Sequence, residues 1–306
     1  CDPLVDISQA SVECKDKGNY EVLGSAWDPS QYAYMTGADQ VPIDPNLIAQ
    51  SSDELVFGGE YEVIPDGRAG IQYTRRWMNA VIEDMSRDEA NTYFIGNPGQ
   101  GMAKDFPLAT RDYDAVTVYF SKSFSDLWLA QVSYTWSYLR GNYAGLFRPE
   151  TEQLDPNVNS DFDLQSLLAN RNGPLPSDRT HVIKVFAAKE FELGKMFSIS
   201  LGLTYKGRSG EPINYLGSHP LYLDDEVFVL PRGSGGRLPW THTVDSRLAV
   251  NVKFAKDYVL TFSGELFNMF NFAAVTSVDE TFTESDVLPF VVTDTTKSPQ
   301  QAICIA

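Results

Sequence analysis

Oxygen-bearing side chains occupy every second position of one polar segment, residues 155–163. The five are Asp155, Asn157, Asn159, Asp161 and Asp163. Carboxylate and amide oxygens in a flexible loop are ligands that Ca²⁺ prefers. Calcium loops of this spacing, however, carry a glycine at the bend and a bidentate glutamate at the end, where this chain has Ser160 and Ser166. We therefore favour a solvated acidic loop, with calcium as the alternative, and expect no required cofactor.

The remaining residues that could carry chemistry do not group along the chain. The three histidines, His181, His219 and His242, are scattered, so their spacing supports no Ser-His-Asp or Cys-His pairing. The glycine-rich stretch 231–237 lacks the strand–loop–helix context of a phosphate-binding loop. Cys1 and Cys14 lie close together, and both a disulfide and free thiols fit an exported polar segment. Nothing in the sequence favours an enzyme.

Charge and hydropathy exclude two further classes of protein. The formal net charge of −17 argues against a nucleic-acid partner, because phosphate binding needs a basic surface. No apolar run is long enough to form a transmembrane helix. The chain also opens without a basic and apolar leader, as expected for a mature chain or a fragment.

Alternation with a period of two is the strongest pattern in the chain. In the segment 197–205 the odd positions are apolar or aromatic, whereas the even positions are small or polar. Successive side chains of a strand point to opposite faces, so such a strand has one apolar and one polar face. The pattern predicts strands near 54–64, 70–84, 111–121, 127–140, 180–191, 197–208, 243–255 and 258–270.

The lengths of these strands and of their connections predict a membrane protein. Soluble strands average about five or six residues, whereas a strand needs roughly nine to eleven to cross a bilayer. Short turns alternate with long polar segments, as in outer-membrane barrels; the turns are 65–69, 122–126, 192–195 and 255–257, and the long segments are about 85–110, 141–179 and 209–242. We predict an all-β antiparallel transmembrane barrel in the bacterial outer membrane, with strands and loops over 54–270 and outer loops at 1–53 and 271–306.

The charged residues of the polar faces are the candidate ligand contacts. If the apolar faces meet lipid, the polar faces line a lumen, where charges need water or partner charges. The candidates for a position in the lumen or near its rim are Arg179, His181, Asp245, Arg247 and Glu265. For any one of them, a structural salt-bridge ladder across the barrel wall is the favoured interpretation over contact with a ligand.

Particular phrases resemble the barrel of Oar-type TonB-dependent receptors. They lie at 59–73, 92–99, 111–116, 154–164, 175–184, 207–215 and 266–271, and the resemblance covers about residues 55–290. It implies a barrel of about 22 strands whose lumen is filled by an N-terminal plug preceded by a TonB box. Plug, box and an aromatic-ended closing strand are not found in this sequence, so we expect a C-terminal part of such a receptor.

Three functions follow as hypotheses. The first is transport of a bulky ligand or an exported protein across the outer membrane, with lipid around the barrel and the TonB complex acting through the plug. The second is a surface adhesion or protein-binding module that uses the long acidic outer loops. The third is a soluble carbohydrate-binding domain, which requires the apolar strand faces to pack on each other. The identity of the ligand and the direction of transport stay open.

Overall fold

The computed structural model describes residues 21–22, 34–35, 41–151, 155, 159–255 and 258–287. The chain divides into two compact units, Cys1–Pro42 and Ile43–Ala306. In the first unit, strands β1 (Glu21–Val22) and β2 (Tyr34–Met35) pair in antiparallel fashion. The proposed pairing of the first two cysteines lies outside the described residues.

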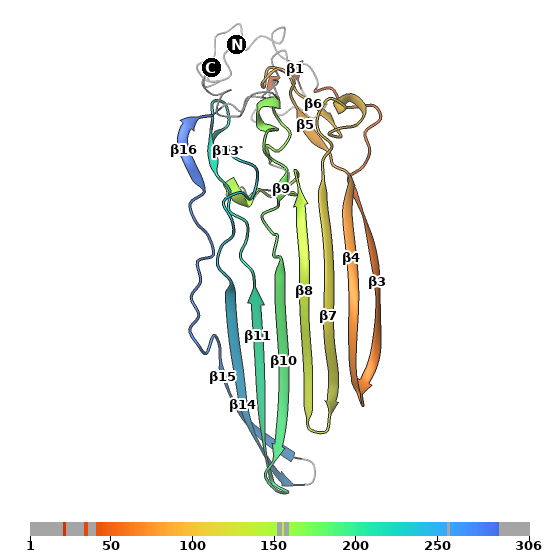
Figure 1. Ribbon diagram of the computed structural model, residues 1–306, viewed down its shortest axis with the longest axis vertical. Coiled ribbons are helices and arrows are strands. Elements are labelled where there is room, and N and C mark those ends of the chain that lie inside the picture. Colours follow the sequence, from red (N-terminus) through yellow and green to blue (C-terminus); the bar gives the residue numbers. More distant parts are fainter. Residues whose placement is uncertain are drawn as a thin grey trace, which may run out of the picture. The chain divides into compact units, whose positions relative to one another are not determined.

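An antiparallel sheet of long strands forms the frame of the second unit (Figure 1). Its order is β15 (Tyr258–Leu266), β14 (Thr241–Ala255), β11 (Phe197–Arg208), β10 (His181–Glu192), β8 (Trp128–Gly141), β7 (Arg111–Ser125), β4 (Gly67–Ala80) and β3 (Ser51–Ile64), with β9 (Gly173–Pro174) added to β8. Neighbours in this order follow one another along the chain, so the sheet is an up-and-down meander. The predicted all-β antiparallel fold is confirmed, and each of the eight predicted strands has a counterpart.

The strand ends differ from the prediction where apolar residues continue past the sheet. The strand predicted over 70–84 ends at Ala80, because Val81 leaves the sheet and is buried in a separate core. Residues Glu83–Met85 then form a short strand, β5. The strand predicted to reach residue 270 ends at Leu266. The turn predicted at 122–126 is tighter, since β7 runs to Ser125.

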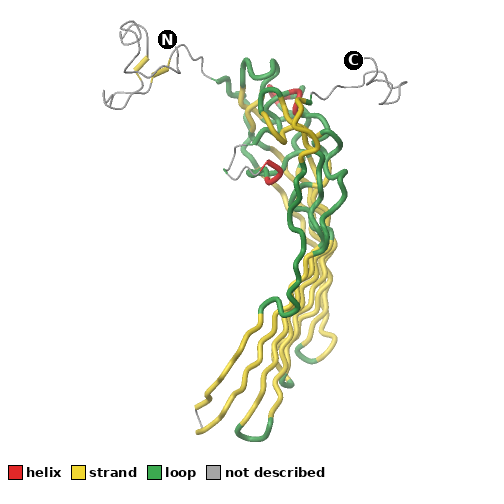
Figure 2. Tube along the Cα trace, turned by 90° about the vertical axis from the view of Figure 1, so that its left-hand side faces the viewer, coloured by secondary structure: helices red, strands yellow, loops and turns green. Residues whose placement is uncertain are grey.

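Short turns and long loops lie at opposite ends of the sheet. The four strands of the first two hairpins, β3, β4, β7 and β8, are 14 or 15 residues long. The hairpins turn within a few residues at one end, and the long connections gather at the other (Figure 2). This is the predicted alternation. Two segments predicted as outer loops contain strand residues, since β3 begins at Ser51 and β16 spans Thr281–Asp286.

The strand register separates an apolar from a polar face. Residues paired across neighbouring strands share a face. One row across β8, β10, β11 and β14 reads Val132, Val185, Tyr205 and Val244. The adjacent row reads Ser133, Lys184, Lys206 and Thr243. The alternation in the sequence is therefore carried across the sheet.

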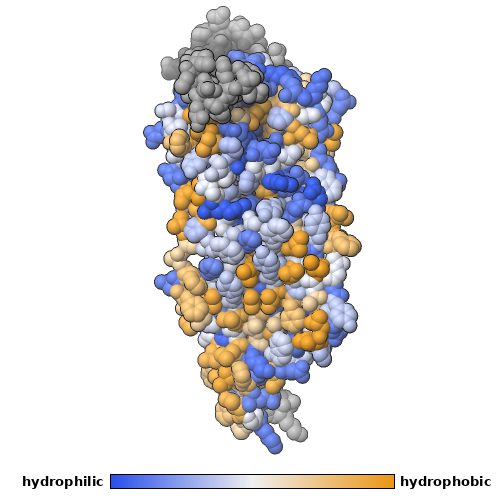
Figure 3. Space-filling model, in the orientation of Figure 1, coloured by the Kyte–Doolittle hydropathy of each residue, from blue (hydrophilic) through white to orange (hydrophobic). Residues whose placement is uncertain are grey.

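Large side chains on the apolar face are exposed along much of the sheet. Leu201, Leu248 and Phe262 are respectively 47%, 50% and 63% exposed. In the view of Figure 3, hydrophobic residues gather over the lower half of the long strands. A soluble carbohydrate-binding domain requires the apolar faces of its strands to pack on each other. The apolar faces of the described strands do not pack in this way.

The hydrophobic core of the unit lies in the long loops instead. We call the segments 81–110, 142–180 and 209–240 the loop cap; they contain β5, β6 (Phe94–Gly96), β12 (Leu216–His219), β13 (Leu223–Phe228) and the 3-10 helices η2 (Gly101–Ala103), η3 (Pro149–Thr151) and η4 (Gln165–Leu167). Buried side chains from the first two segments, including Met85, Phe106 and Phe162, form one cluster. In a second, Leu164 and Leu167 pack with Val227. Over the described residues, no helix is long and apolar enough to cross a membrane.

Candidate functional site

Three of the predicted lumen residues lie together on the polar face. Arg247 on β14 pairs with Glu265 on β15, and their Nε and Oε1 atoms are 3.5 Å apart. Both side chains are about half exposed, at 56% and 49%. Asp245 lies two positions before Arg247 on the same face, and its carboxylate accepts a hydrogen bond of 2.7 Å from the backbone N–H of Asn268. Exposed ion pairs contribute at most about 1 kcal/mol, so this pair could exchange partners with a charged ligand.

Hollows in the sheet lie on this polar face. One is lined by Asp245, Arg247 and Glu265 together with Phe186 and Thr204. The next hollow along the sheet is lined by residues that include Gln131, Ser133, Lys184 and Lys206. Neighbouring hollows therefore lie on the polar face of this part of the sheet. A polar, hollowed face suits the wall of a water-filled lumen.

Arg179 lies in the loop cap, not in a strand. It comes two residues before β10, donates a hydrogen bond of 2.9 Å to the backbone oxygen of Ser209, and pairs with the Glu211 carboxylate. Both partners belong to the segment that follows β11. Arg179 therefore links two loops at the end of the sheet, close to the predicted rim.

His181 differs from its predicted place. It shares a face with Ile183 and Val185, which makes it part of the apolar face. Its ring stacks on Tyr134, and its Nδ1 is 2.9 Å from the Tyr134 hydroxyl oxygen. The prediction rested on the polar chemistry of histidine, whereas the strand register decides the face. His181 does not join Asp245 in the lumen row.

A belt of stacked rings follows the apolar face at its loop end. The members are Tyr134, His181, Trp240, His242 and Tyr205, with centroids 5.7–6.1 Å apart. Phe272 extends it from His242 at 5.7 Å. Rings that are apolar in body and polar at one edge prefer the level where lipid meets water. The belt therefore fits the outer boundary of a membrane.

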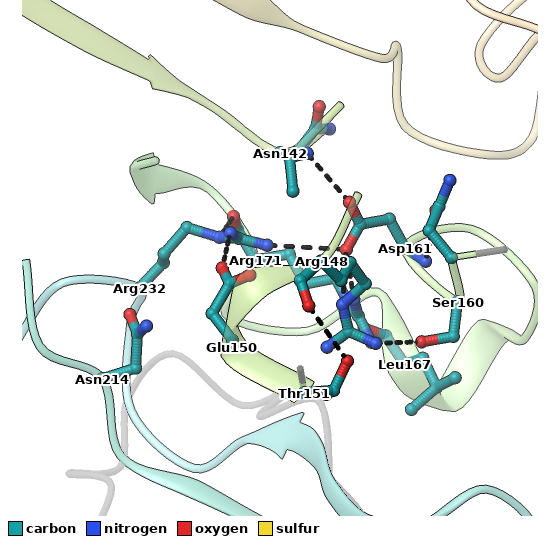
Figure 4. Close-up of polar contacts among 12 residues, drawn as sticks. Asn142, Arg148, Glu150, Thr151, Ser160, Asp161, Leu167, Arg171, Asn214 and Arg232 are labelled. Carbon is teal, nitrogen blue, oxygen red and sulfur yellow. Dashed lines mark hydrogen bonds and ion pairs between the residues drawn. The ribbon is translucent and has the colours of Figure 1, made fainter. Parts of the chain in front are cut away.

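An ion cluster that the sequence did not predict lies in the loop cap (Figure 4). The fully buried carboxylate of Asp161 pairs with Arg171, while Arg148 and Arg232 approach it at 3.7 and 3.5 Å. Its other oxygen accepts a hydrogen bond of 2.9 Å from the backbone N–H of Ala144. Two further acids balance the charge: Arg148 pairs with Glu226 and Arg232 with Glu150. Three cations thus meet three anions.

The electrostatics of this cluster favour its charged form. Burial acts to raise the pKa of Asp161, but the three surrounding guanidinium groups more than offset it and hold that pKa below its ordinary value. Burial, with help from nearby Arg148, lowers the pKa of Arg171 to about 10, so it stays protonated at neutral pH. Arg148 and Arg171 come from the segment 142–180 and Glu226 from 209–240. The cluster therefore locks two loops together.

Among the described calcium candidates of 155–163, Asp161 does not share a site with Asn159 and Asp163. The Asp161 carboxylate is surrounded by three arginines, which would repel a cation. Its predicted role as a calcium ligand is therefore wrong. Asn159 donates a 3.4 Å hydrogen bond to Glu83 and accepts one of 3.1 Å from the backbone of Asp161. Asn157 lies outside the described residues, and Asp155 is described without the neighbours on either side. Asp163 lies with the carboxylates of Glu83 and Asp84, and Asn159 contacts the same Glu83.

Comparison with known proteins gives one curated relative. No protein-family model matches the chain, and no solved structure matches it significantly. The TonB-dependent transporter Oar of Myxococcus xanthus is 54% identical to it over 289 residues, which is 94% of this chain. The chain spans 27% of that protein's length. The resemblance to Oar-type TonB-dependent receptors is thereby confirmed: nearly the whole chain is similar to a part of such a transporter.

Proposed function

We propose that the protein to which this chain belongs is a TonB-dependent transporter of the outer membrane, and that this chain forms part of its barrel wall. The observation that carries the proposal is the 54% identity over 94% of the chain to a protein named as such a transporter. The sheet supports it independently, because its strands are long enough to cross a bilayer and its apolar face is exposed.

In this proposal each surface has its own partner. The apolar face contacts lipid, because the transfer of exposed leucine and phenylalanine side chains out of water lowers the free energy. The polar face lines the lumen, where the Arg247–Glu265 ion pair is part of the wall that faces the plug or the ligand. The loop cap lies outside the cell, opposite the short periplasmic turns. Energy reaches the barrel from the TonB complex through the plug.

We further propose that the cargo is a bulky ligand or an exported protein. The loop cap is an argument for a large cargo. A structured cap with its own core offers an extended, preorganised surface at the mouth of the barrel. The direction of transport is tested together with the cargo. The decisive comparison is between the proteins in the medium and those in the periplasm.

The test uses the full-length protein in its own outer membrane. Mass spectrometry compares secreted and periplasmic proteins in cells that carry the protein, cells that lack it, and cells whose TonB complex is inactivated. If the protein exports its cargo, the same proteins should be missing from the medium and should accumulate in the periplasm in both deficient strains. Loss of uptake of a large solute in both strains supports import. A full-length protein recovered from the soluble fraction without detergent contradicts the barrel itself.

Adhesion or protein binding through the loop cap is the second candidate. It is favoured by the adjacent apolar residues Leu146 and Phe147, which are 39% and 45% exposed on the cap. A Leu146→Ser/Phe147→Ser variant should lose attachment of cells to a surface or partner cell while transport continues. Loss of transport with attachment intact would favour the barrel function alone. Deleting all of 141–179 is a poorer test, because it removes Asp161 and Phe162 from the buried interior.

A further inference from the structure

Three carboxylates of the loop cap converge on one point. Glu83 and Asp84 lie in β5, and Asp163 lies just before η4. One oxygen from each lies within 4.8 Å of the others. Glu83 and Asp163 are buried, at 7% and 8% exposure, whereas Asp84 opens to solvent. Two of the three acids are therefore shielded from solvent, and the third is open to it.

In the described part of the chain, no positively charged group lies at bonding distance from these carboxylates. Among the described residues, none of the ion pairs involves Glu83, Asp84 or Asp163, although Asp161, two positions before Asp163, has three arginines around it. Oδ2 of Asp163 accepts a hydrogen bond of 2.8 Å from the Tyr222 hydroxyl. Oδ1 of Asp163 is buried and has no hydrogen-bond partner in this part of the chain. A buried carboxylate oxygen left without a partner is costly, and a bound cation beside it would remove that cost.

The backbone holds the two acidic segments in fixed positions. The N–H of Ser86, directly after β5, donates a hydrogen bond of 2.7 Å to the backbone oxygen of Asp163. Ser86 and Leu164 also form a parallel bridge. Main-chain geometry therefore brings together the side chains on either side of this bridge. Their own interaction would not, because three carboxylates repel one another.

The three acids repel one another as anions. Burial, together with neighbouring carboxylates, raises the pKa of Glu83 to about 8 and that of Asp163 to about 7. Two kinds of occupant relieve this repulsion, protons or a cation. The open oxygen of Asp163 and the solvent-exposed Asp84 favour a cation, because they offer a free ligand atom and a side on which water completes the coordination shell.

We propose that Glu83, Asp84 and Asp163 bind one calcium ion that ties β5 to the segment leading into η4. The donors are all carboxylate oxygens, which suits a hard cation and not zinc or copper, whose sites use nitrogen or sulfur. Ca²⁺ tolerates an irregular set of carboxylates completed by water, whereas Mg²⁺ demands a regular octahedron and keeps most of its own water. The site lies outside the segment in which the sequence alone placed calcium, apart from Asp163.

The test measures bound calcium on the full-length protein, purified in detergent and stripped with a chelator. Equilibrium dialysis with ⁴⁵Ca²⁺ should find one ion fewer per chain in Asp163→Asn and in Glu83→Gln, or an affinity at least about tenfold lower at that site. Asp84→Asn should weaken binding as well, and its exposed side chain keeps the test decisive if a buried variant fails to fold. Asp224→Asn, an exposed carboxylate of the same cap, and Asp155→Asn should bind as the wild type does.

Three results would overturn the proposal. The first is equal calcium binding by the wild type and by all three ligand variants. The second is a wild-type cap whose protection from protease depends on pH but not on calcium, which would make protons the occupants of the site. The third is loss of binding in Asp155→Asn with retention in Asp84→Asn, which would return calcium to the loop predicted from the sequence.

Discussion

The charge of Asp161 should hold the loop cap closed. Its carboxylate is the only acid that all three arginines of the ion cluster approach, among the residues described. Asp161→Asn keeps the size of the side chain and an oxygen for the Ala144 N–H, but removes the negative charge. Three buried arginines would then face only Glu226 and Glu150, leaving one buried positive charge without compensation.

The magnitude follows from the burial of the group. Breaking a buried ion pair by removing one partner costs about 3–5 kcal/mol, mostly through the charge left behind. Two of the arginines are 3.5 and 3.7 Å from Asp161, longer than a hydrogen bond, so we expect the lower part of that range. About 3 kcal/mol raises the population of the open cap roughly 100-fold, since 1.36 kcal/mol corresponds to a factor of about ten.

Limited proteolysis of the full-length protein, in whole cells or in detergent, measures this population. Cleavage within 142–180 tracks the open form when opening is fast relative to cutting. Asp105→Asn is the matched control, because Asp105 pairs with Arg87 at 2.7 Å in the same cap but both side chains are 44% exposed. That pair contributes at most about 1 kcal/mol, so cleavage should rise less than about sixfold. Cleavage of Asp161→Asn no faster than of Asp105→Asn would refute the role of the cluster.

Three further outcomes are expected. Leu201→Arg on the apolar face should cost about 2–4 kcal/mol and lower the folded fraction seen as heat-modifiable mobility on gels, whereas Ser200→Arg on the polar face should not. Trp240→Ala removes two ring contacts to histidines, with centroid distances of 5.7 and 6.0 Å, and should lower the free energy of unfolding by about 1–3 kcal/mol in a thermal melt. In the presence of a chelator, the protease resistance of the cap should fall as the pH rises from about 5 to 9. Glu83 and Asp163 have folded-state pKa values of about 8 and 7, above their ordinary ones, so the folded state binds more protons than the unfolded chain. Protease resistance that does not change with pH would contradict this.

The strands were predictable because one local rule decides them. A strand with one face in lipid and one in water must alternate, so the pattern over 197–205 is written in neighbouring residues. The rule failed at Val81, where an apolar residue continues the sequence pattern but enters the core of the cap. Local hydrophobicity does not say which apolar environment a residue enters. The end of β4 therefore depends on tertiary packing.

The alternation in the sequence also indicates the face of His181. Its odd position matches Ile183 and Val185, and counting in steps of two would have placed it on the apolar side. The ion cluster is a different case. Arg148 and Glu226 are 78 residues apart, and Glu226 lies in a loop that the alternation rule does not reach. No local signal distinguishes Asp161, which the arginines neutralise, from Asp163, which lacks such partners, so the predicted calcium loop combined two residues with opposite roles.

The contrast between sheet and cap bears on where this chain can be stable. The cap has its own buried core and ion cluster, whereas the described strands leave leucine, valine and phenylalanine exposed along one face. Every residue of β3 and of β15, the outermost strands of the sheet, is exposed. Unpaired strand edges can bind further strands, and an exposed apolar face is stabilised by lipid. In the proposed barrel, the free energy that stabilises the sheet comes from hydrocarbon on one face and from neighbouring strands at both edges, whereas the cap is stabilised by contacts within this chain.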